Sequence, residues 1–413
     1  MKLTKQERSW ILYDVACSAF TMVISTIIPI YFASLTAAAN IPDNLSTAYW
    51  GYATSISTLI MALLAPILGA IADYEGMKKK LFTFFLCIGI IMALSLSFVE
   101  QWAVYLGIFV LAKLGYSACN VFYDSMLVDV TDNDRMDRIS SYGFAWGYIG
   151  SCIPFVAGIL FILVTPFGMT TAMATQIAVA ISVVWWAVLT GPLLKNVKQT
   201  HCLENRKNKV TDAFKRLFQT LKSIRKNKPL FYFILAYFFY IDGVYTIISM
   251  ATKYGDEVGI DSTHLILALL LTQVVAFPFA IWAGRLAEKW GCLRLIKIFI
   301  VVYAAVCLFA IQLDKPWEFW LLAVIVGMAQ GGIQSLSRSY YGKMVPKEES
   351  NEYFGFFDIF GKFADFFGPL LLAVVSTVTG KSNYGVSALV VLFIVGFILL
   401  SQIPSHTEQK QSS

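Results

Sequence analysis

The sequence predicts an all-α, polytopic membrane protein with twelve transmembrane helices in two pseudo-symmetric six-helix bundles. Of the 413 residues, 58% are apolar and 14% are charged, whereas soluble domains are about one quarter charged. Twelve apolar runs lie close to the ~20 residues that a membrane-spanning helix needs. A basic segment divides these runs six from six, and short motifs recur on its two sides, which indicates an internal duplication.

The twelve runs are the elements of the predicted fold. In order, they occupy residues 10–35, 48–72, 81–98, 103–127, 140–164, 172–194, 230–253, 263–287, 293–312, 317–341, 353–378 and 384–403. With the N-terminus in the cytoplasm, 27 of the 32 Lys and Arg residues fall in inner segments or toward the inner ends of spans, three in outer loops or at an outer span end, and two deeper inside spans. Because positive residues favour the cytoplasmic side of a membrane, the sequence predicts that both termini are cytoplasmic.

The segments between the runs predict the domain organisation. We expect an N-terminal six-helix bundle at 1–194, a basic cytoplasmic linker at 195–228, a C-terminal six-helix bundle at 229–403 and a polar tail at 404–413. The positive charge lies in inner loops, so it predicts contact with membrane lipid and no nucleic-acid partner. The seven Cys lie in spans or inner segments, and the three His show no metal-ligand spacing. The sequence therefore predicts no structural disulfide, no metal and no cofactor.

A loop motif follows the second span and returns after the eighth. Gly, acid and Gly recur at relative positions 0, 4 and 7, and the two copies are 215 residues apart. The first Gly permits close approach of helices, the acid can cap a neighbouring helix or pair with basic residues, and the second Gly permits a tight turn. The motif residues are Gly69, Asp73, Gly76 and Lys78 in the first copy, and Gly284, Glu288 and Gly291 in the second.

This motif resembles the loop motif of the major facilitator superfamily, although Met77 stands where the family has Arg and Glu288 replaces Asp. Further segments resemble the vacuole-effluxer-like branch, which includes the autophagy-linked vacuolar amino-acid exporter. They lie at 10–20, 122–127, 135–144, 330–339 and 361–363. Cys17 and Ile241 stand where that branch has Asn. The resemblance implies the major facilitator fold, transport of amino acids or another small polar solute, a bacterial plasma membrane location and a monomer.

Polar residues recur at steps of three and four along the first, fourth, seventh and tenth spans. Such steps place side chains on one face of a helix, over about 16 Å in each span. The stripes contain Asp14, Ser18, Thr21 and Ser25; Lys113, Ser117, Asn120 and Asp124; Asp242, Thr246, Ser249 and Lys253; and Gln330, Gln334, Ser337 and Tyr341 beside Arg338. In the resembled superfamily these four helices line the central cavity. We therefore interpret the stripes as a substrate or proton pathway; the alternative is ordinary helix packing.

Asp14 and Asp242 are the acids to which we assign the main functional role. Each is the lone acid of its span, with no basic residue three or four positions away. A charge inside a membrane costs about 2.5–3.5 kcal/mol, so each acid is expected to face a cavity or a partner. Either can carry a coupling proton or contact a substrate ammonium. The alternative is a buried acid bonded to Lys113 or to a hydroxyl such as that of Tyr13.

Three further charged residues share one face of the eleventh span. Asp358, Lys362 and Asp365 are spaced for ion pairs along a helix. We interpret them as a fixed internal ion pair; the alternative is a gate that breaks during transport. Asp124 and Arg338 lie toward the inner ends of their spans. They can form a cytoplasmic gate; the alternative is that their charged ends simply extend to the membrane surface, as snorkelling side chains do.

The function that fits these features best is secondary transport by alternating access, which internal repeats favour. The expected partners are a small-molecule solute, a coupling proton or cation, and membrane lipid. The alternatives are a cation-coupled carrier of sugars, peptides or lipid-like molecules, and a non-transporting membrane sensor. No nucleotide-binding motif and no catalytic constellation is visible, so we do not expect an enzyme.

Overall fold

The computed structural model describes residues 2–204, 209–257, 259–313 and 315–404; the side chains of 209–211, 252–253, 256–257, 262–263, 363–366 and 382 lie outside the description as well. Within the described residues, twelve helices are long and apolar enough to cross a membrane. They match the twelve predicted spans in order and confirm the all-α fold. Most extend a few residues beyond the apolar runs, as in Asn133–Val164, because polar residues at the ends of a span remain helical.

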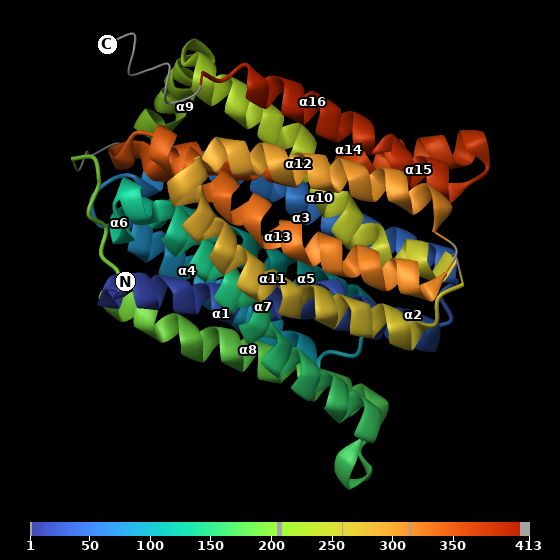
Figure 1. Ribbon diagram of the computed structural model, residues 1–413. Coiled ribbons are helices and arrows are strands. Elements are labelled where there is room, and N and C mark those ends of the chain that lie inside the picture. Colours follow the sequence, from blue (N-terminus) through green and yellow to red (C-terminus); the bar gives the residue numbers. More distant parts are fainter. Residues whose placement is uncertain (1, 205–208, 258, 314, 405–413) are drawn as a thin grey trace. The chain divides into compact units, whose positions relative to one another are not determined.

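Spatial contacts divide the chain into two compact units. The first contains residues 1–131, 146–213 and 347–355. Its principal helix contacts join α1 to α8, α4 to α5 and α3 to α5 (Figure 1). Its helices are α1 (Lys5–Ser25), α2 (Ile27–Ala38), α3 (Asp43–Ala72), α4 (Met77–Ser95), η1 (Leu96–Phe98), α5 (Trp102–Ser125), α6 (Leu127–Val130), most of α7 (Asn133–Val164), η2 (Pro166–Gly168) and α8 (Thr171–Asn196).

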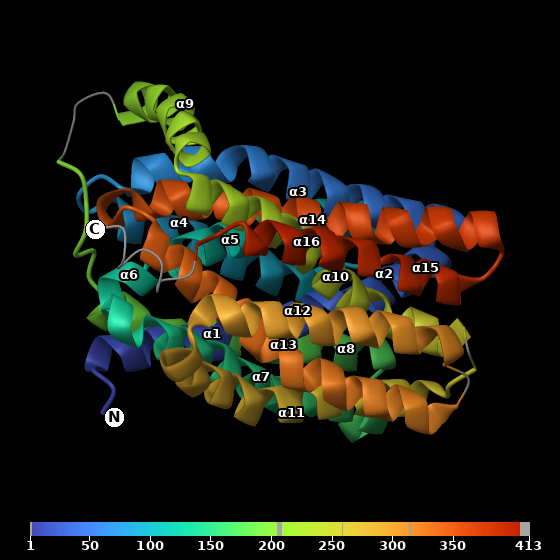
Figure 2. The same ribbon diagram turned by 45° about the horizontal axis from the view of Figure 1, so that its top comes forward.

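The second unit contains residues 132–145, 214–346 and 356–413. In it α11 packs on α13, α10 on α16, and α12 on both α13 and α16 (Figure 2). Its helices are most of α9 (Lys209–Lys226), α10 (Lys228–Glu257), α11 (Ser262–Trp290), α12 (Cys292–Phe309), η3 (Ala310–Gln312), α13 (Pro316–Met344), most of α14 (Ser350–Thr379), α15 (Ser382–Ala388) and α16 (Val390–Ser401). The short helix η4 (Lys347–Glu349) belongs to the first unit.

Two short segments pack away from the half of the sequence that contains them. Residues 132–145, at the start of α7, join the second unit, and residues 347–355, at the start of α14, join the first. The predicted bundles at 1–194 and 229–403 follow the order of the spans and stay a prediction. The contacts also show that each unit includes the start of one helix from the other half of the sequence.

The first predicted span is interrupted where the sequence contains a proline. Helix α1 ends at Ser25 and α2 begins at Ile27, with Thr26 between them. Pro29 lies four residues after Ser25. A proline has no N–H to offer the carbonyl four residues earlier, and its ring collides with that carbonyl. The α1 stripe of Asp14, Ser18, Thr21 and Ser25 therefore ends at a break in the helix.

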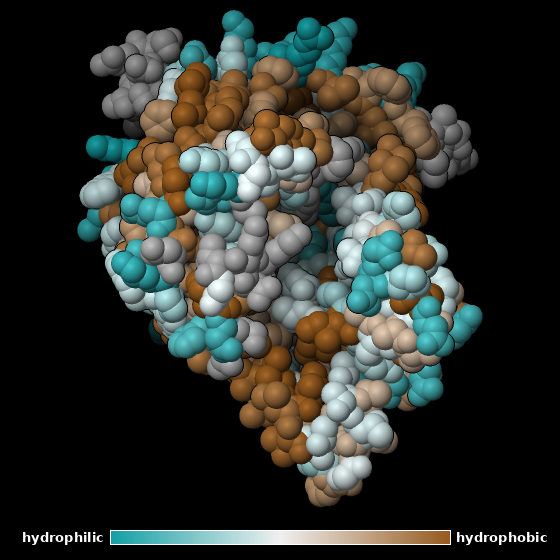
Figure 3. Space-filling view, turned by 90° about the vertical axis from the view of Figure 1, so that its right-hand side faces the viewer, coloured by the Kyte–Doolittle hydropathy of each residue, from teal (hydrophilic) through white to brown (hydrophobic). Residues whose placement is uncertain are grey.

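Large apolar side chains lie openly on the helix surfaces, as the hydrophobic areas in Figure 3 illustrate. Ile30, Leu163 and Val378 are among those more than two-thirds exposed. A soluble domain rarely exposes large contiguous apolar areas, whereas a lipid-facing helix requires them. The exposure pattern therefore fits helices surrounded by lipid.

Candidate functional site

The first copy of the loop motif forms a close helix crossing, which we call the first junction: Gly69, Asp73, Lys78, Asp129 and residues 347–355. A Cβ atom on Gly69 would lie 2.2 Å from the carbonyl oxygen of Asn351, and one on Gly355 would lie 2.6 Å from that of Ala65. These distances leave no room for any side chain. The two glycines therefore allow the backbones of α3 and α14 to touch.

Asp73 caps the start of α14 within this junction. Its buried carboxylate accepts hydrogen bonds from the backbone N–H of Asn351 (2.9 Å), the side-chain amide of Asn351 (2.8 Å) and the backbone N–H of Glu352 (3.2 Å). The first N–H groups of a helix have no partner inside the helix, and the helix dipole favours a negative charge there. The position four residues after Gly69 thus serves the capping role that the motif allows.

Lys78 and Asp129 form a buried ion pair beside this cap. The Nζ atom of Lys78 lies 2.5 Å from an Asp129 carboxylate oxygen, and both side chains are almost fully enclosed. The other carboxylate oxygen accepts hydrogen bonds from the backbone N–H groups of Thr200 (2.8 Å) and His201 (2.9 Å). Each oxygen of Asp129 therefore has a donor, as a buried charge requires.

Residues 197–203, which follow α8, are bound along the same junction. Leu203 forms a parallel bridge with Tyr74, and its N–H donates to the carbonyl of Asp73 at 2.8 Å. The side-chain amide of Gln199 donates to the carbonyl of Ala72 at 2.9 Å. Burial raises the pKa of the Cys202 thiol in this segment, and the nearby acids Glu75 and Asp129 act in the same direction. The first residues of the basic linker are thus held by the loop motif.

The second copy of the motif forms a second junction, composed of Gly284, Glu288, residues 135–144 and the end of α13. A Cβ atom on Gly284 would lie 2.6 Å from Cβ of Ser141. Glu288 accepts a hydrogen bond from the guanidinium of Arg138 at 2.5 Å. Asp137 accepts from the Ser339 hydroxyl (2.7 Å) and the Lys343 ammonium (2.6 Å). Here the motif acid pairs with a basic residue and does not cap a helix.

Arg338 belongs to the second junction and does not reach toward water. It is buried, and its guanidinium donates to the hydroxyl (3.0 Å) and the carbonyl (3.1 Å) of Ser140. It also lies 4.3 Å above the ring centre of Phe144. These contacts join α13 to the start of α7, and the gate and snorkelling interpretations of Arg338 stay predictions.

The turns after the two motifs need their second glycines. Gly76 has φ of +69° and Gly291 has φ of +85°. Residues with a side chain rarely adopt such angles. Both copies therefore use glycine for the same conformational reason.

The polar stripe residues of the first unit face neighbouring helices. Thr21 shares a short hydrogen bond with the Tyr116 hydroxyl, and Ser18 lies against Gly147 of α7. Lys113 lies 3.5 Å from both the Thr54 carbonyl and the Thr58 hydroxyl of α3. The remaining predicted residues of this unit are the buried Asp14 and the half-buried Asn120 and Asp124.

In the second unit, Asp242 and Thr246 face α14. Both are buried, and Asp242 accepts a hydrogen bond from the backbone N–H of Gly368 at 2.8 Å. A Cβ atom on Gly368 would fall 1.9 Å from the Thr246 hydroxyl. This glycine therefore lets α14 lie directly against the polar stripe of α10. Of the α13 residues, Gln330 is buried and Gln334 is half-buried.

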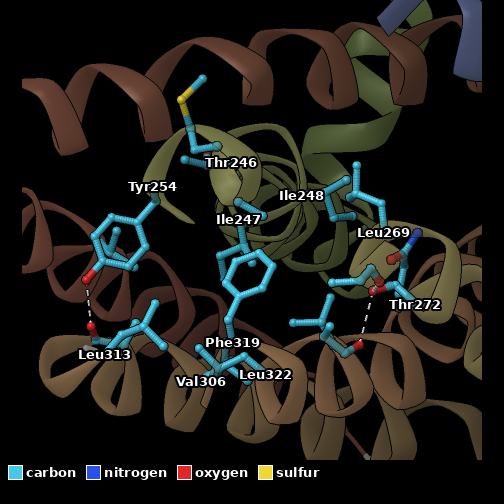
Figure 4. Close-up of a pocket in the computed structure, with 18 of the residues that line it drawn as sticks. Thr246, Ile247, Ile248, Tyr254, Leu269, Thr272, Val306, Leu313, Phe319 and Leu322 are labelled. Atoms are coloured by element: carbon cyan, nitrogen blue, oxygen red, sulfur yellow. Dashed lines mark hydrogen bonds between the residues drawn. The ribbon is translucent and has the colours of Figure 1, made fainter. Parts of the chain in front are cut away.

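A cavity of about 110 Å³ lies inside the second unit (Figure 4). Its walls come mainly from apolar residues such as Ile247, Leu269 and Phe319, and it brings together two stripe residues, Thr246 and Gln330. Thr272 and Gln273 are further polar wall residues, and the sequence analysis did not identify them. The cavity can therefore hold a small, mostly apolar group with a polar contact.

The charged residues of α14 are described in part. Asp358 and Lys362 form an ion pair one helical turn apart. The side chain of Asp365 lies outside the described residues.

Several junction residues were not predicted as site residues: Asp129, Asp137, Ser140, Lys343 and Asn351. Asp137 and Ser140 lie in the segment 135–144, which resembles the vacuole-effluxer-like branch, so the sequence contained a signal for them. Asn351 lies in the first turn of α14, directly after a charged loop, where helix-capping contacts are common. Asp129 and Lys343 carried no sequence signal, because only the fold brings them to their partners.

Replacing Gly69 with alanine is expected to weaken the first junction by about 1–3 kcal/mol, the usual cost of overpacking. The new methyl group would collide with the Asn351 carbonyl. Faster hydrogen exchange in residues 347–355 would measure this loss. Gly51→Ala on the same helix is the control, because nothing lies within 4 Å of a Cβ atom there. Equal exchange in both variants would contradict the proposed close crossing.

Comparison with known proteins agrees with this architecture. Residues 42–413 match the family described as "Vacuole effluxer Atg22 like". The MFS-type transporter YxiO of Bacillus subtilis (strain 168) is 46% identical over 412 residues, which covers 98% of this chain and 96% of YxiO. Autophagy-related protein 22 of Cryptococcus neoformans var. neoformans serotype D (strain B-3501A) is 27% identical over 297 residues. That match covers 67% of this chain and 54% of the relative, so the chain spans about half of its length.

The fold is also found among solved structures. The major facilitator superfamily transporter FucP, in the outward conformation, superposes with a TM-score of 0.74 over 96% of this chain and 98% of FucP, at 13% identity. At that identity the likeness concerns the fold alone. The family match and the 46% identity to YxiO carry the assignment. The chain therefore belongs to the vacuole effluxer Atg22-like family and is an integral membrane transporter of the major facilitator type.

Proposed function

We propose that this transporter is a secondary carrier that moves a small polar solute by alternating access, with amino acids as the first solute class to test. The observation that carries the proposal is the pair of junctions at equivalent positions of the internal repeat. Each joins the motif-bearing end of one span to the start of a helix from the other half of the sequence through a glycine contact and charged groups. Contacts of this kind can close one side of a carrier and release in the other state.

The polar stripes supply the proposed pathway. Asp14, Asp242, Thr246 and Gln330 are buried inside membrane-spanning helices. Acids inside membrane spans serve as proton relays in many pumps and transporters, so we assign proton coupling to Asp14 and Asp242. The plasma membrane of a bacterium, with both termini in the cytoplasm, is the location that we propose.

Ligand-induced thermal stabilisation of the purified protein tests the proposal. Amino acids, short peptides, sugars and nucleosides are screened at two pH values, because a ligand stabilises the state that it binds. An amino acid that raises the melting temperature and also supports counterflow in proteoliposomes would support the proposal. A well-folded protein that responds to no small solute would contradict it.

The Asp242→Asn variant is expected to lose proton-driven accumulation by at least about tenfold while it retains counterflow. Asparagine keeps an oxygen that can accept from Gly368 N–H, so we expect the fold to persist, but it cannot carry a proton. Accumulation and exchange of the same solute are measured in proteoliposomes. Asp43→Asn, at the exposed start of α3, is the control. Loss of both activities would assign Asp242 to solute binding, and loss of neither would refute its role.

A lipid-like solute is the second candidate, and the apolar cavity of Figure 4 favours it. The cavity offers apolar walls with few polar groups, as an acyl chain or another hydrophobic moiety requires. Lysophospholipids added to the same thermal screen separate the two candidates. Stabilisation that disappears on filling the cavity with Ala323→Phe would support the lipid-like solute, whereas an effect on amino-acid binding would place that solute in the cavity.

A further inference from the structure

Helix α9, in the basic linker, exposes a row of large apolar side chains. Phe214, Phe218 and Leu221 are 49%, 76% and 51% exposed. They follow one another at steps of four and three, so they lie on one face of the helix. The adjoining residues Thr220 and Ile224 are buried. One edge of the apolar face is thus packed on the protein, and the other is left open.

Positive charges flank the open edge. Lys215, Lys222 and Lys226 are exposed and follow one another at steps of seven and four, which places them on one face beside the apolar row. Residues 212–226 contain five Lys and Arg and one acid, Asp212. An apolar row bordered by lysines is the pattern of helices that lie in a membrane surface. A water-exposed linker would gain nothing from the two phenylalanines.

A single residue joins α9 to the candidate membrane span α10. Helix α9 ends at Lys226 and the spanning helix α10 begins at Lys228, so Asn227 is the whole connection. The Asn227 N–H donates to the Ser223 carbonyl at 3.0 Å, and its carbonyl accepts from Phe231 N–H at 2.9 Å. Figure 1 shows α9 at the end of the unit where α10 starts. The apolar row cannot move far from the lipid headgroups.

We propose that α9 binds the anionic lipid surface of the leaflet on its own side, with Phe214, Phe218 and Leu221 among the acyl chains. The three lysines then lie among the phosphate and carboxylate headgroups. A basic residue near a charged leaflet contributes roughly fivefold in binding. Three lysines together contribute on the order of a hundredfold. This surface does not depend on the solute or on the coupling ion of the carrier.

Hydrogen exchange of the intact protein in lipid nanodiscs tests the proposal. One disc contains phosphatidylcholine alone, and the other contains phosphatidylcholine with about one-third phosphatidylglycerol. We expect amide protection in residues 212–226 to rise at least tenfold in the anionic disc and to fall again at high salt, because salt screens surface charge. Adding inorganic phosphate to the neutral disc shows whether a free anion alone can protect α9, or whether an anionic lipid surface is needed.

Variants assign the effect to α9. The triple change Lys215→Gln, Lys222→Gln and Lys226→Gln is expected to abolish the lipid-dependent protection, and so is the pair Phe214→Ser and Phe218→Ser. The control removes three exposed lysines elsewhere, through Lys80→Gln, Lys195→Gln and Lys289→Gln, and should retain the response. Equal protection in both discs would overturn the proposal. Protection by inorganic phosphate alone, or equal losses in the control, would overturn it too.

Discussion

Replacing Lys78 with methionine is expected to lower the free energy of unfolding by about 3–5 kcal/mol, because it leaves the charge of Asp129 buried without its partner. Lys78 and Asp129 are almost fully enclosed, and two backbone N–H groups of the linker also bind that carboxylate. Methionine fills a similar volume, so the loss reports on charge and not on a cavity. Denaturant titration in detergent measures it.

Two further variants make this result interpretable. Lys80→Met removes an exposed lysine two residues later and should change the stability by less than about 1 kcal/mol. Adding Asp129→Asn to Lys78→Met should recover part of the loss, because the orphaned charge disappears. If Lys78→Met and Lys80→Met are equally stable, the ion pair does not hold the first junction.

The Asp73→Asn variant is expected to weaken the first junction by about 2 kcal/mol, which is roughly a 30-fold shift toward the open state. Asparagine has one acceptor oxygen where the carboxylate uses both, and its amide would oppose an N–H donor of α14. The Asn351 and Glu352 amides have no helical partner of their own. Their hydrogen exchange should therefore accelerate about 30-fold, and transport should fall, because the proposed alternating access requires this junction to close.

Asp43→Asn is the matched control for this variant, since Asp43 lies at the other end of α3 and is exposed. It should leave the exchange of residues 347–355 and the transport rate unchanged. Transport at the wild-type rate in Asp73→Asn, despite faster exchange at the junction, would show that the junction is structural. Unchanged exchange would show that Asp73 does not cap α14 in the membrane.

Much of the fold could be predicted because lipid imposes a local rule. A backbone inside a bilayer must satisfy its own hydrogen bonds, so each apolar run has to be a helix. The twelve spans and their order follow from this rule, and the structure confirms them. The proline break after Ser25 is local in the same sense, although its position was not predicted.

The sequence predicted only those residues of the candidate site that recur in the internal repeat. The duplicated spacing identified Gly69, Asp73, Gly284 and Glu288 without any coordinates. The spacing could not identify the partner of each acid. The partners differ between the two copies, because Asp73 caps a helix, whereas Glu288 pairs with Arg138. Which option an acid takes depends on the surface that packs against it, and that surface comes from the other half of the sequence.

Composition and periodicity are properties of each segment, so the amino-acid sequence was enough to predict a membrane-spanning helical repeat with polar stripes. The packing of the starts of α7 and α14 with distant spans is visible in the folded structure alone. The tertiary structure alone brought Asp129 to Lys78 and placed Arg338 on Ser140. Such contacts join residues dozens to hundreds of positions apart, and side-chain type does not encode which charges will meet. Packing selects them, because a buried charge is tolerated only where the fold supplies its partner.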